Sequence, residues 1–130
     1  MSINYSVLLQ PFAERHYLKN FRKKYKGAWN ITWRAICEEL RRFDSFLETS
    51  VAETITENNN IRIAKTEFRV TDTTESRKSS GNRCIVAVHK DTSIVKVLLI
   101  YHKNDLGDGN ETAKWKQEIK NNYPEYRELL

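Results

Sequence analysis

The sequence is poor in the residues that build disulfide frameworks and metal centres. It has two cysteines and three histidines among 130 residues. Cys37 and Cys84 are too far apart for a zinc cluster, and both lie within apolar patterns, where a free thiol behaves as a small hydrophobic group. Asp105, Asp108 and Glu111 lie close together but lack the ligand spacing of any recognised calcium motif. We therefore expect two reduced core thiols, a cytoplasmic protein, and neither a metal nor a cofactor.

Long apolar runs and several familiar motifs are also missing. Nothing approaches the roughly 20 apolar residues of a membrane helix, and residues 1–5 are not a charged leader ahead of an apolar segment. A glycine-rich phosphate loop, Gly-x-Ser-x-Gly and Cys-x-x-Cys are absent from the sequence. The length predicts one domain over residues 1–130, with neither a membrane span nor a secretion signal.

Basic residues are plentiful and unevenly distributed. The chain has 22 Lys and Arg against 17 Asp and Glu, a net charge of +5. Residues 1–47 and 61–103 each carry a surplus of five positive charges, whereas residues 48–60 and 104–130 are net negative, at −3 and −2. Such a distribution favours a polyanion or an acidic protein as partner. A lysine-rich surface that is merely solvated is the alternative.

Hydrophobic periodicity in the first third of the chain predicts a strand followed by a helical hairpin. Residues 3–9 alternate apolar and polar side chains, as a strand does, and residues 12–25 carry an apolar stripe at helical spacing. Gly27 is expected to end that helix in the left-handed conformation, and Asn30 is a candidate cap for a second helix that runs to Leu47. The apolar face of this second helix is expected to consist of Trp33, Ile36, Cys37, Leu40, Phe43 and Leu47.

The rest of the chain is predicted to contain three strands and one helix. Residues 48–60 are acidic and polar and end in three asparagines, which indicates a loop. A final helix is expected between Asn110, its cap, and Pro124, its stop. Because residues 94–102 are apolar on both sides, that strand is expected to be central. The predicted strands are residues 61–72, 83–89 and 94–102, with a loop over 73–82 and a tight turn over 90–93.

This order of elements predicts an α+β fold. It consists of an N-terminal strand, a helical hairpin, an antiparallel three-strand meander that completes a small mixed sheet, and a C-terminal helix. We expect the helices to pack on one face of the sheet and to leave the other face open. The side chains available for the open face are unusually basic for strands, and they include Lys65, Glu67, Arg69, Arg83, His89, Lys96 and Lys103.

A basic sheet face of this kind could bind RNA or cleave it. Cleavage by the RNA's own 2′-hydroxyl needs a base, cations that offset charge on the phosphorane, and a proton donor for the leaving oxygen. Clustered lysines and arginines can supply all three. His89 and His102 end neighbouring strands and are expected to lie close together, whereas His16 is expected on the surface. The cations expected to converge are Arg69, Arg77, Lys78, Arg83 and Lys103.

The aromatic residues at helical spacing are expected to be core rather than base-stacking platforms. Trp33 and Phe43 are the clearest core candidates. Core burial and stacking on a nucleotide both remain open for Trp29, Tyr101, Trp115 and Tyr123.

The segment from Lys78 to Val86 (KSSGNRCIV) and the later segment from Val97 to Lys103 (VLLIYHK) resemble the C-terminal half of RelE/ParE-superfamily toxins. In that family a basic residue and Ser-Ser-Gly precede a strand that carries an arginine. The next strand is apolar and ends in a basic cluster ahead of a terminal helix. The opening strand and helical hairpin match the family order as well. The resemblance implies a RelE/ParE-like fold and the toxin component of a type II toxin–antitoxin system.

The resemblance also implies roles for individual residues of an mRNA endonuclease that needs no metal. Arg83 matches the arginine that stabilises the transition state, and Lys78 lies near the basic stretch that supplies the general base. Lys103 matches the cluster after the last strand. His102 is a fourth catalytic candidate, because Asn104 stands where the family has an arginine often assigned as general acid. The candidate RNA-binding residues are Lys65, Arg69, Arg77 and Lys96.

Other positions depart from the family pattern. Thr74 and Ser76 stand where lysines are expected ahead of Ser-Ser-Gly. The family's usual catalytic set is therefore incomplete here, and His102 or Lys65 could substitute. A late tyrosine of the family is matched only roughly, by Trp115 or Tyr123.

Three interpretations share the basic surface. The favoured one is a toxin that cleaves mRNA, with the ribosome as a candidate place of action, and that is neutralised by a cognate antitoxin protein laid over the basic surface. The second is a toxin with the same fold that does not cleave RNA, a gyrase-directed or other non-catalytic inhibitory toxin of the ParE type. The third is a plain nucleic-acid-binding module without toxicity.

Overall fold

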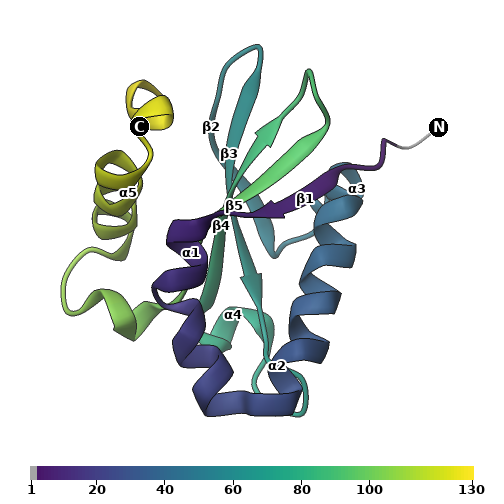
Figure 1. The fold of residues 1–130 in the computed structure, drawn as a ribbon, viewed down its shortest axis with the longest axis vertical. Helices are drawn as coiled ribbons and strands as arrows, with labels where there is room; N and C mark the ends of the chain where they lie inside the picture. The colour runs from purple at the N-terminus through teal and green to yellow at the C-terminus, as the bar shows by residue number, and fades with distance from the viewer. Residues whose placement is uncertain (1–2) are drawn as a thin grey trace.

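The computed structural model describes residues 3–130, and a five-stranded mixed sheet lies at its centre (Figure 1). The strand order is β1-β5-β4-β3-β2, in which the last four strands form an antiparallel meander and β1 joins β5 in parallel. This is the α+β fold that the order of elements predicts, with β5 inside the sheet as expected. The strands are β1 (Ser6–Leu9), β2 (Ala52–Glu57), β3 (Ile61–Phe68), β4 (Asn82–His89) and β5 (Ile94–His102).

Helices precede, interrupt and follow the meander. The cap and stop predicted for the final helix are confirmed, because Asn110 Oδ1 accepts a hydrogen bond from the backbone N–H of Ala113 and a new turn begins at Pro124. Within residues 3–130 the structure contains no helix that is long and apolar enough to cross a membrane. The helices are α1 (Pro11–Arg15), α2 (Leu18–Arg41), α3 (Phe43–Phe46), α4 (Arg77–Ser80), η1 (Lys103–Leu106), α5 (Glu111–Asn122) and η2 (Pro124–Leu129).

The helical hairpin turns at Lys26, one residue before the expected glycine. Lys26 has φ 38° and ψ −114°, which divides α2 into a first arm over residues 18–25 and a second arm over 27–41. Gly27 is not among the residues with positive φ, so the prediction of a left-handed Gly27 is wrong. Asn30 lies inside the second arm and is not a helix cap.

The buried face of the second arm is centred one residue away from the predicted stripe. Trp29, Thr32 and Ile36 are buried, whereas Trp33 and Cys37 are partly exposed at the flank of the stripe. A threonine can occupy a core position here because its hydroxyl is satisfied: Thr32 Oγ1 donates to the Ala28 carbonyl at 2.8 Å and accepts from the Thr71 amide at 2.9 Å. Trp33 is therefore a flanking residue rather than the centre of the core.

Residues 48–60, expected to be a loop, contain the edge strand β2. It pairs antiparallel with β3, with Ala52 opposite Thr66, and a register shift lies between Thr54 and Thr56. An edge strand has one neighbour and one largely solvated side, so it requires few apolar residues and leaves a weak sequence signal. Two of the three acidic residues of this segment, Glu53 and Glu57, lie on that strand, where Glu53 pairs with Lys65.

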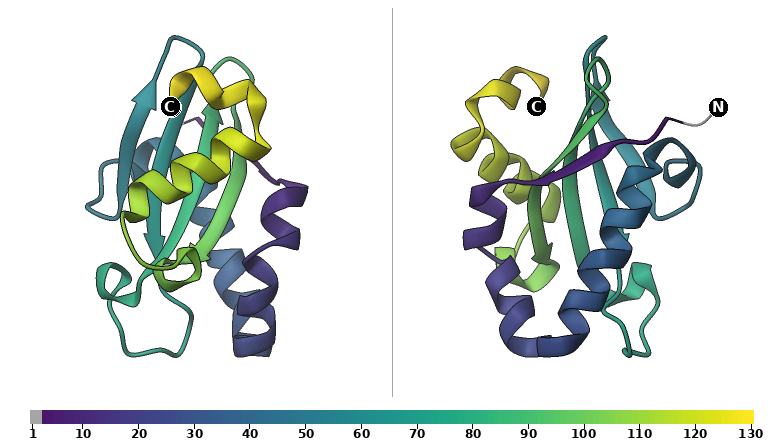
Figure 2. Two further views of the ribbon diagram at one scale, coloured as in Figure 1. Left: turned by 90° about the vertical axis from the view of Figure 1, so that its left-hand side faces the viewer. Right: turned by 45° about the vertical axis from the view of Figure 1, so that its right-hand side comes forward.

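Helices cover both faces of the sheet, not one (Figure 2). The second arm of α2 and α3 pack on one face, against alternate strand residues such as Val86. On the other face α5 packs through Trp115, and η2 through Tyr126, against the cluster that includes Ile85. The expectation of an open, basic sheet face is therefore wrong. The physical reason is that β4 and β5 are apolar on both sides, so each side must be removed from water.

Candidate functional site

The structure divides the predicted cations among several places instead of gathering them. Lys65 lies on the α5 side of β3 and pairs with Glu53 at 3.5 Å. Arg69 and Arg77 line a cavity of about 510 Å³ beside the second arm of α2, where Arg77 pairs with Glu39 at 2.7 Å. These residues do not form one phosphate-binding surface.

The two histidines that were predicted to form a pair lie at opposite ends of the β4–β5 ladder, and Lys96 lies toward the His89 end. His89 and Ile94 are opposite at one end of the β4–β5 ladder, whereas Asn82 and His102 are opposite at the other end. The expectation that His89 and His102 lie close together is therefore wrong. Burial lowers the pKa of His89, the charge of Lys96 lowers it further, and its Nε2 lies 2.7 Å from the Tyr126 hydroxyl.

Arg83 lies on the α5 side of β4 and is largely enclosed. Its side chain is 12% exposed, and its Nε is 3.5 Å from Glu111 Oε2 at the beginning of α5. The Tyr101 hydroxyl donates to the same carboxylate oxygen at 2.7 Å. Burial first, and then the hydrogen bond to Glu111, raise the pKa of Tyr101, so its hydroxyl stays protonated and acts as a donor. The predicted transition-state arginine thus has a carboxylate as its neighbour.

Further polar atoms are buried around this arginine. Glu67 lies directly across the ladder from Arg83, and Trp115 packs nearby on the α5 face. Glu67 Oε2, Arg83 Nε and Trp115 Nε1 have no hydrogen-bond partner among the residues that the structure describes. We call this group the α5-side cluster: Glu67, Arg83, Tyr101, Glu111 and Trp115.

The strand register also identifies the lysine nearest to Arg83 on its own face. Lys65 is opposite Ile85, two positions along β4 from Arg83, and both side chains belong to the α5 side. Thr74 and Ser76 lie in the connection that leads from β3 to α4, away from this ladder. The number of residues ahead of Ser-Ser-Gly therefore does not show which lysine lies beside Arg83, because a loop and the short helix α4 separate β3 from β4.

The opposite side of the same strand ends carries a pocket. Asn82 and His102 face the first arm of α2 and, with side chains from that arm, border a pocket of about 250 Å³. Sequence reasoning did not find it, because its walls come from three segments, residues 20–25, Asn82 and residues 102–105, that are far apart in the sequence. We call it the α2-side pocket; it is lined by Asn20, Phe21, Lys24, Tyr25, Asn82, His102, Asn104 and Asp105.

The turn at the end of β5 holds the His102 ring in place. Its Nδ1 accepts a hydrogen bond from the Asn104 amide at 3.1 Å, and the His102 amide donates to Asp105 Oδ2 at 3.0 Å. In the neutral ring Nε2 therefore carries the proton and is a donor. Gly81 has φ +80°, and a Cβ added there would lie 2.7 Å from Nε2. Glycine is thus required both by its backbone conformation and by the close approach of the ring.

Lys78 and Lys103 are exposed at the same end of the sheet. Lys78 lies in α4, whose beginning is closed by reciprocal hydrogen bonds between Ser76 and Ser79. Lys103 begins η1, and its amide donates to the Gly81 carbonyl at 2.8 Å. His102 therefore faces the α2 side of this end, Lys78 and Lys103 are exposed on the segments beside it, and Arg83 lies on the reverse face.

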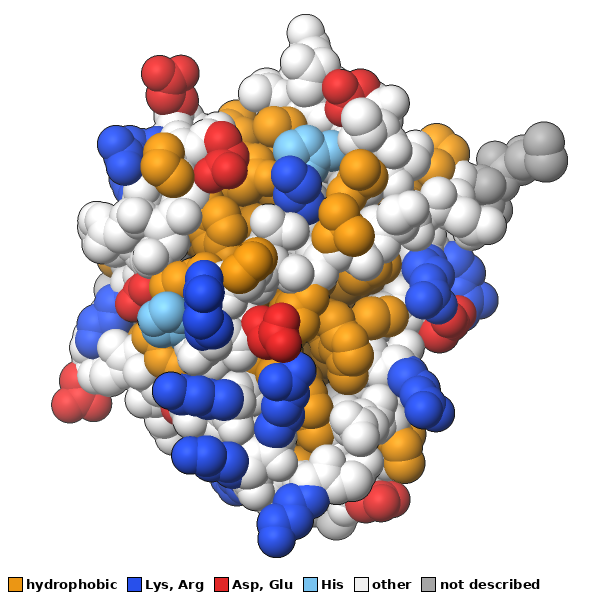
Figure 3. All heavy atoms as spheres, in the orientation of Figure 1, with side chains coloured by type: hydrophobic (Ala, Val, Ile, Leu, Met, Phe, Trp, Pro, Cys, Tyr) orange, Lys and Arg blue, Asp and Glu red, His pale blue; other side chains and the backbone are white. Residues whose placement is uncertain are grey.

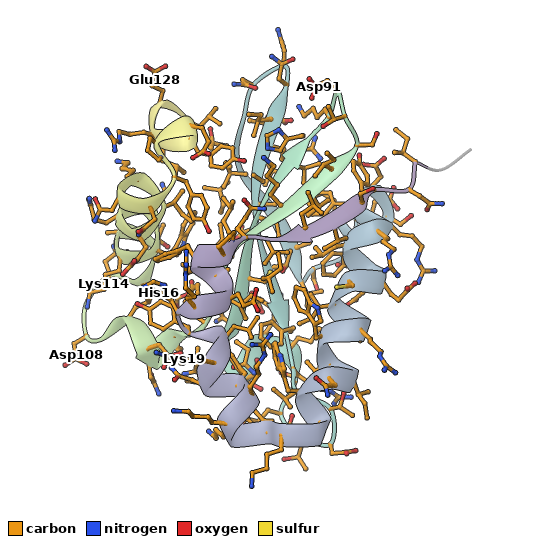
Figure 4. The ribbon with its side chains drawn as sticks, in the orientation of Figure 1. His16, Lys19, Asp91, Asp108, Lys114 and Glu128 are labelled. Carbon is orange, nitrogen blue, oxygen red and sulfur yellow. The ribbon has the colours of Figure 1, made fainter. Side chains whose placement is uncertain are left out.

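The positive surface continues from there over the hairpin. Lys and Arg side chains gather over α1 and the first arm of α2 in Figure 3, and Figure 4 shows His16 and Lys19 pointing outward from these two helices. His16 is exposed, as predicted. The exposed cations of the first arm and its turn are Lys19, Arg22, Lys23, Lys24 and Lys26.

The aromatic residues with an open assignment are all buried. Trp29, Tyr101, Trp115 and Tyr123 belong to the two hydrophobic clusters of the core, so they are not stacking platforms in this conformation. Tyr25, which the sequence analysis placed in a helical stripe, is partly exposed and lines the α2-side pocket. Within residues 3–130 no three His, Cys, Asp or Glu side chains are grouped as metal ligands would be.

Several solved structures are similar to this chain, two of them with a TM-score above 0.5, although no family model and no curated protein matches its sequence. One is the archaeal RelE–RelB complex from Pyrococcus horikoshii OT3, with a TM-score of 0.55, 11% identity, and coverage of 76% of this chain and 94% of that chain. The other is a mutant of the E. coli toxin RelE in the free state, with a TM-score of 0.51, 15% identity, and coverage of 92% and 98%. The chain therefore has the fold of RelE.

Proposed function

We propose that this chain is the toxin of a type II toxin–antitoxin pair and that it acts by cleaving mRNA. The observation that carries the proposal is the RelE fold, which one similar structure displays in a complex of RelE with RelB. An antitoxin protein is accordingly the proposed partner. The basic surface over α1 and the first arm of α2 suits an acidic segment of that partner or the phosphates of RNA.

The proposed reaction is attack of a ribose 2′-hydroxyl on the adjacent phosphate, without a metal. The 2′-oxygen would form a bond to phosphorus as the bond from phosphorus to the 5′-oxygen breaks. Lys78 in its neutral form would take the proton of the 2′-hydroxyl, His102 would give its Nε2 proton to the leaving 5′-oxygen, and Lys103 would hold the adjoining phosphate. On the reverse face, Arg83 and Lys65 are the cations available to an RNA strand that passes over the end of the sheet. Arg83 would stabilise the charge that develops on the phosphorane.

Inducible expression followed by mapping of mRNA ends tests this function. We expect growth arrest with new mRNA ends, relief of the arrest when a cognate antitoxin is co-expressed, and loss of both effects in Arg83→Ala. Removing one preorganised donor typically lowers a rate by about 10²–10³. Lys103→Ala should act in the same direction, and Lys96→Ala, near the far end of β5, is the control. New ends that persist unchanged in Arg83→Ala would remove this residue from the mechanism.

One observation favours a second function, a non-catalytic inhibitory toxin of the ParE type directed at gyrase or another target. Arg83 lies against Glu111 and Lys65 against Glu53, so both cations of the α5 side already have carboxylate neighbours. Growth arrest without new mRNA ends would favour this alternative. A chain that binds RNA with a steep salt dependence, about 0.7 in log–log slope for each phosphate contact, but arrests no growth would instead be a nucleic-acid-binding module.

A further inference from the structure

The outer edge of β1 lacks the features that usually protect the edge of a sheet. β1 is the first strand in the order β1-β5-β4-β3-β2, so β5 is its one neighbour in the sheet. Among the described residues, no helix or strand lies across the outer side of β1 in Figure 1 or in the right-hand view of Figure 2. Proteins normally protect such an edge with charged side chains, proline or a bulge. Residues 3–10 contain no charged residue and no proline.

The opposite edge of the sheet is protected. β2 carries Glu53 and Glu57, and a register shift lies between Thr54 and Thr56. Glu57 is held by Lys90, whose Nζ lies 2.7 Å from its Oε2. A further strand added there would meet charges and an irregular backbone. Of the two edges, β1 is therefore the one that can accept another strand.

β1 also exposes apolar side chains. Within residues 3–130 three large apolar side chains are exposed, and two of them are Ile3, at 49%, and Leu8, at 46%. Val7 and Leu9 pack against the α2-side core, so Leu8 points to the α5 side of the sheet. In Figure 3 apolar side chains are exposed across the middle of the face on which β1 lies. The edge therefore combines an apolar surface with a free backbone.

The hydrogen bonds to β5 show which backbone groups of β1 are free. The amides of Ser6 and Gln10 donate to carbonyl oxygens of β5 and of the turn before it, at 2.9 and 3.1 Å. The backbone of a strand directs the N–H and C=O groups of successive residues to opposite sides. Val7 and Leu9 therefore direct their N–H and C=O groups away from β5, toward the open edge.

This row of free groups ends symmetrically on either side of Leu8. Three residues before it, the Tyr5 amide already donates to the Arg41 carbonyl at 2.8 Å. Three residues after it, Pro11 has no N–H to donate. A second β1 in the opposite direction can thus pair with the free groups and leave no outward donor of residues 5–11 unpaired.

We propose that β1 pairs in antiparallel fashion with β1 of a second copy of this chain, about a two-fold axis at Leu8, so that the two sheets become one. Val7 of each copy and Leu9 of the other then exchange both of their backbone hydrogen bonds. Leu8 lies opposite Leu8 of the second copy as a non-hydrogen-bonded pair, the arrangement in which facing side chains are closest. Such a two-fold interface uses the same surface on both copies.

The lack of charge identifies the occupant as a second copy. A strand that pairs here must itself be free of charges facing Leu8, and the chain's own β1 meets this condition. The net charge of +5 on each copy opposes association, so added salt should strengthen it. Because β1 has only four residues, the interface is small, and we expect a Kd on the order of 100 µM.

Analytical ultracentrifugation of the full chain tests the proposal. Between about 10 µM and 1 mM the average mass should rise from 15.4 kDa toward twice that value, and more so at higher salt. Leu8→Lys places like charges opposite each other and should weaken association by at least about tenfold. Ile31→Lys is the matched control, because Ile31 is 55% exposed on α2, and it should leave association unchanged.

A disulfide tests the register. In a Cys37→Ser background, Leu8→Cys should cross-link the two copies readily, because Cα atoms of a non-hydrogen-bonded pair lie about 4.5 Å apart, within the range of disulfides. Ser6→Cys is an exposed control on the same side of β1; its partner position is Gln10 of the second copy, so it should cross-link much more slowly. Cys84 is fully buried and should not react.

Four results would each overturn the proposal: a monomer at 1 mM, association that Leu8→Lys leaves intact, association that weakens with salt, or equally fast cross-linking of Ser6→Cys and Leu8→Cys. The first would assign the edge to a different partner, and the third would assign association to charged surfaces. The proposal is independent of the proposed function. β1 lies beside Ile94–Val97, at the other end of β5 from His102, and none of these measurements involves RNA or growth.

Discussion

The two faces of the sheet present different chemistry at the same end of β4 and β5. On the α2 side, Asn82 and His102 border a pocket of about 250 Å³. On the α5 side, Arg83 and Tyr101 lie beneath Glu111. Side chains that follow one another along a strand point to opposite faces, so chain neighbours enter unlike environments. The comparison shows that the pocket lies on the face of Asn82, the residue before Arg83, and that Arg83 itself lies on the covered face.

Removing the largest side chain from each face should produce the largest effects. Trp29 is 2% exposed on the α2 side and Trp115 is fully buried on the α5 side. Trp29→Ala and Trp115→Ala should each lower the free energy of unfolding by about 3–5 kcal/mol, measured by urea denaturation. Trp33→Ala is the matched control on α2, and its loss should be clearly smaller because Trp33 is partly exposed. An equal loss at Trp33 and Trp29 would contradict the observed phase of α2.

The second prediction concerns the polar contacts of the α5 side alone. Glu111→Ala removes the carboxylate that neighbours Arg83 and accepts from the Tyr101 hydroxyl. Two largely enclosed polar groups would lose this partner, so we expect a loss of about 1–3 kcal/mol in the free energy of unfolding. Glu128→Ala, at an exposed position in η2, should change it by less than about 0.5 kcal/mol. If the two variants are equally stable, the α5-side cluster contributes nothing to stability.

The third prediction uses pH to test how the C-terminal turn is held on the α5 side. Burial, and then the charge of Lys96, lower the pKa of His89 below its usual value of 6.5 in the folded chain. The unfolded chain therefore binds more protons between the lowered pKa and 6.5, and stability is lost as the pH falls through this window. From about pH 7.5 to pH 5, Tm should fall more in the wild type than in His89→Gln. His16→Gln, at an exposed site, should behave like the wild type.

The smallest effect is expected at the hairpin turn of α2. Lys26 has φ 38° and ψ −114°, close to the first central position of a type II′ turn, where glycine is favoured. Lys26→Gly should therefore raise the free energy of unfolding by up to about 1 kcal/mol in urea denaturation. A Cβ added at Gly27 meets nothing within 4 Å, so Gly27→Ala is a control without a steric penalty. A destabilised Lys26→Gly variant would show that the turn does not require positive φ at this residue.

The sequence predicts the sheet well where periodicity and hydrophobicity act together. The strand over residues 94–102 is central because both of its sides are apolar, and the structure confirms this. Because β5 is apolar on both sides, both faces of the sheet must be covered by helices, so the expectation of an open face was inconsistent with this pattern. The strand β2 has a weak signal because an edge strand is partly solvated. The cap at Asn110 was predictable because its hydrogen bond is local in sequence.

The candidate site was less predictable, because it depends on contacts between distant segments. The resemblance around Arg83 indicates the correct end of the sheet, but it does not reveal that Glu111 covers this arginine. The α2-side pocket is lined by Asn82 together with Lys24 and Tyr25. Neither short motifs nor hydrophobic periodicity predict contacts between segments so far apart in the sequence. A strand register, which places Lys65 on the face of Arg83, becomes visible only after the strands are paired.

The parallel pairing of β1 with β5 determines when the protein can fold during its synthesis. Ser6 of β1 pairs with Ile94 of β5, so β1 cannot join the sheet until β5 has been synthesised. Contacts of such long sequence separation close late and slowly. His102 and Tyr101 are the final residues of β5, so neither the α2-side pocket nor the α5-side cluster exists in a shorter nascent chain. The α2-side pocket and the α5-side cluster can therefore form only after the chain has been synthesised beyond the end of β5.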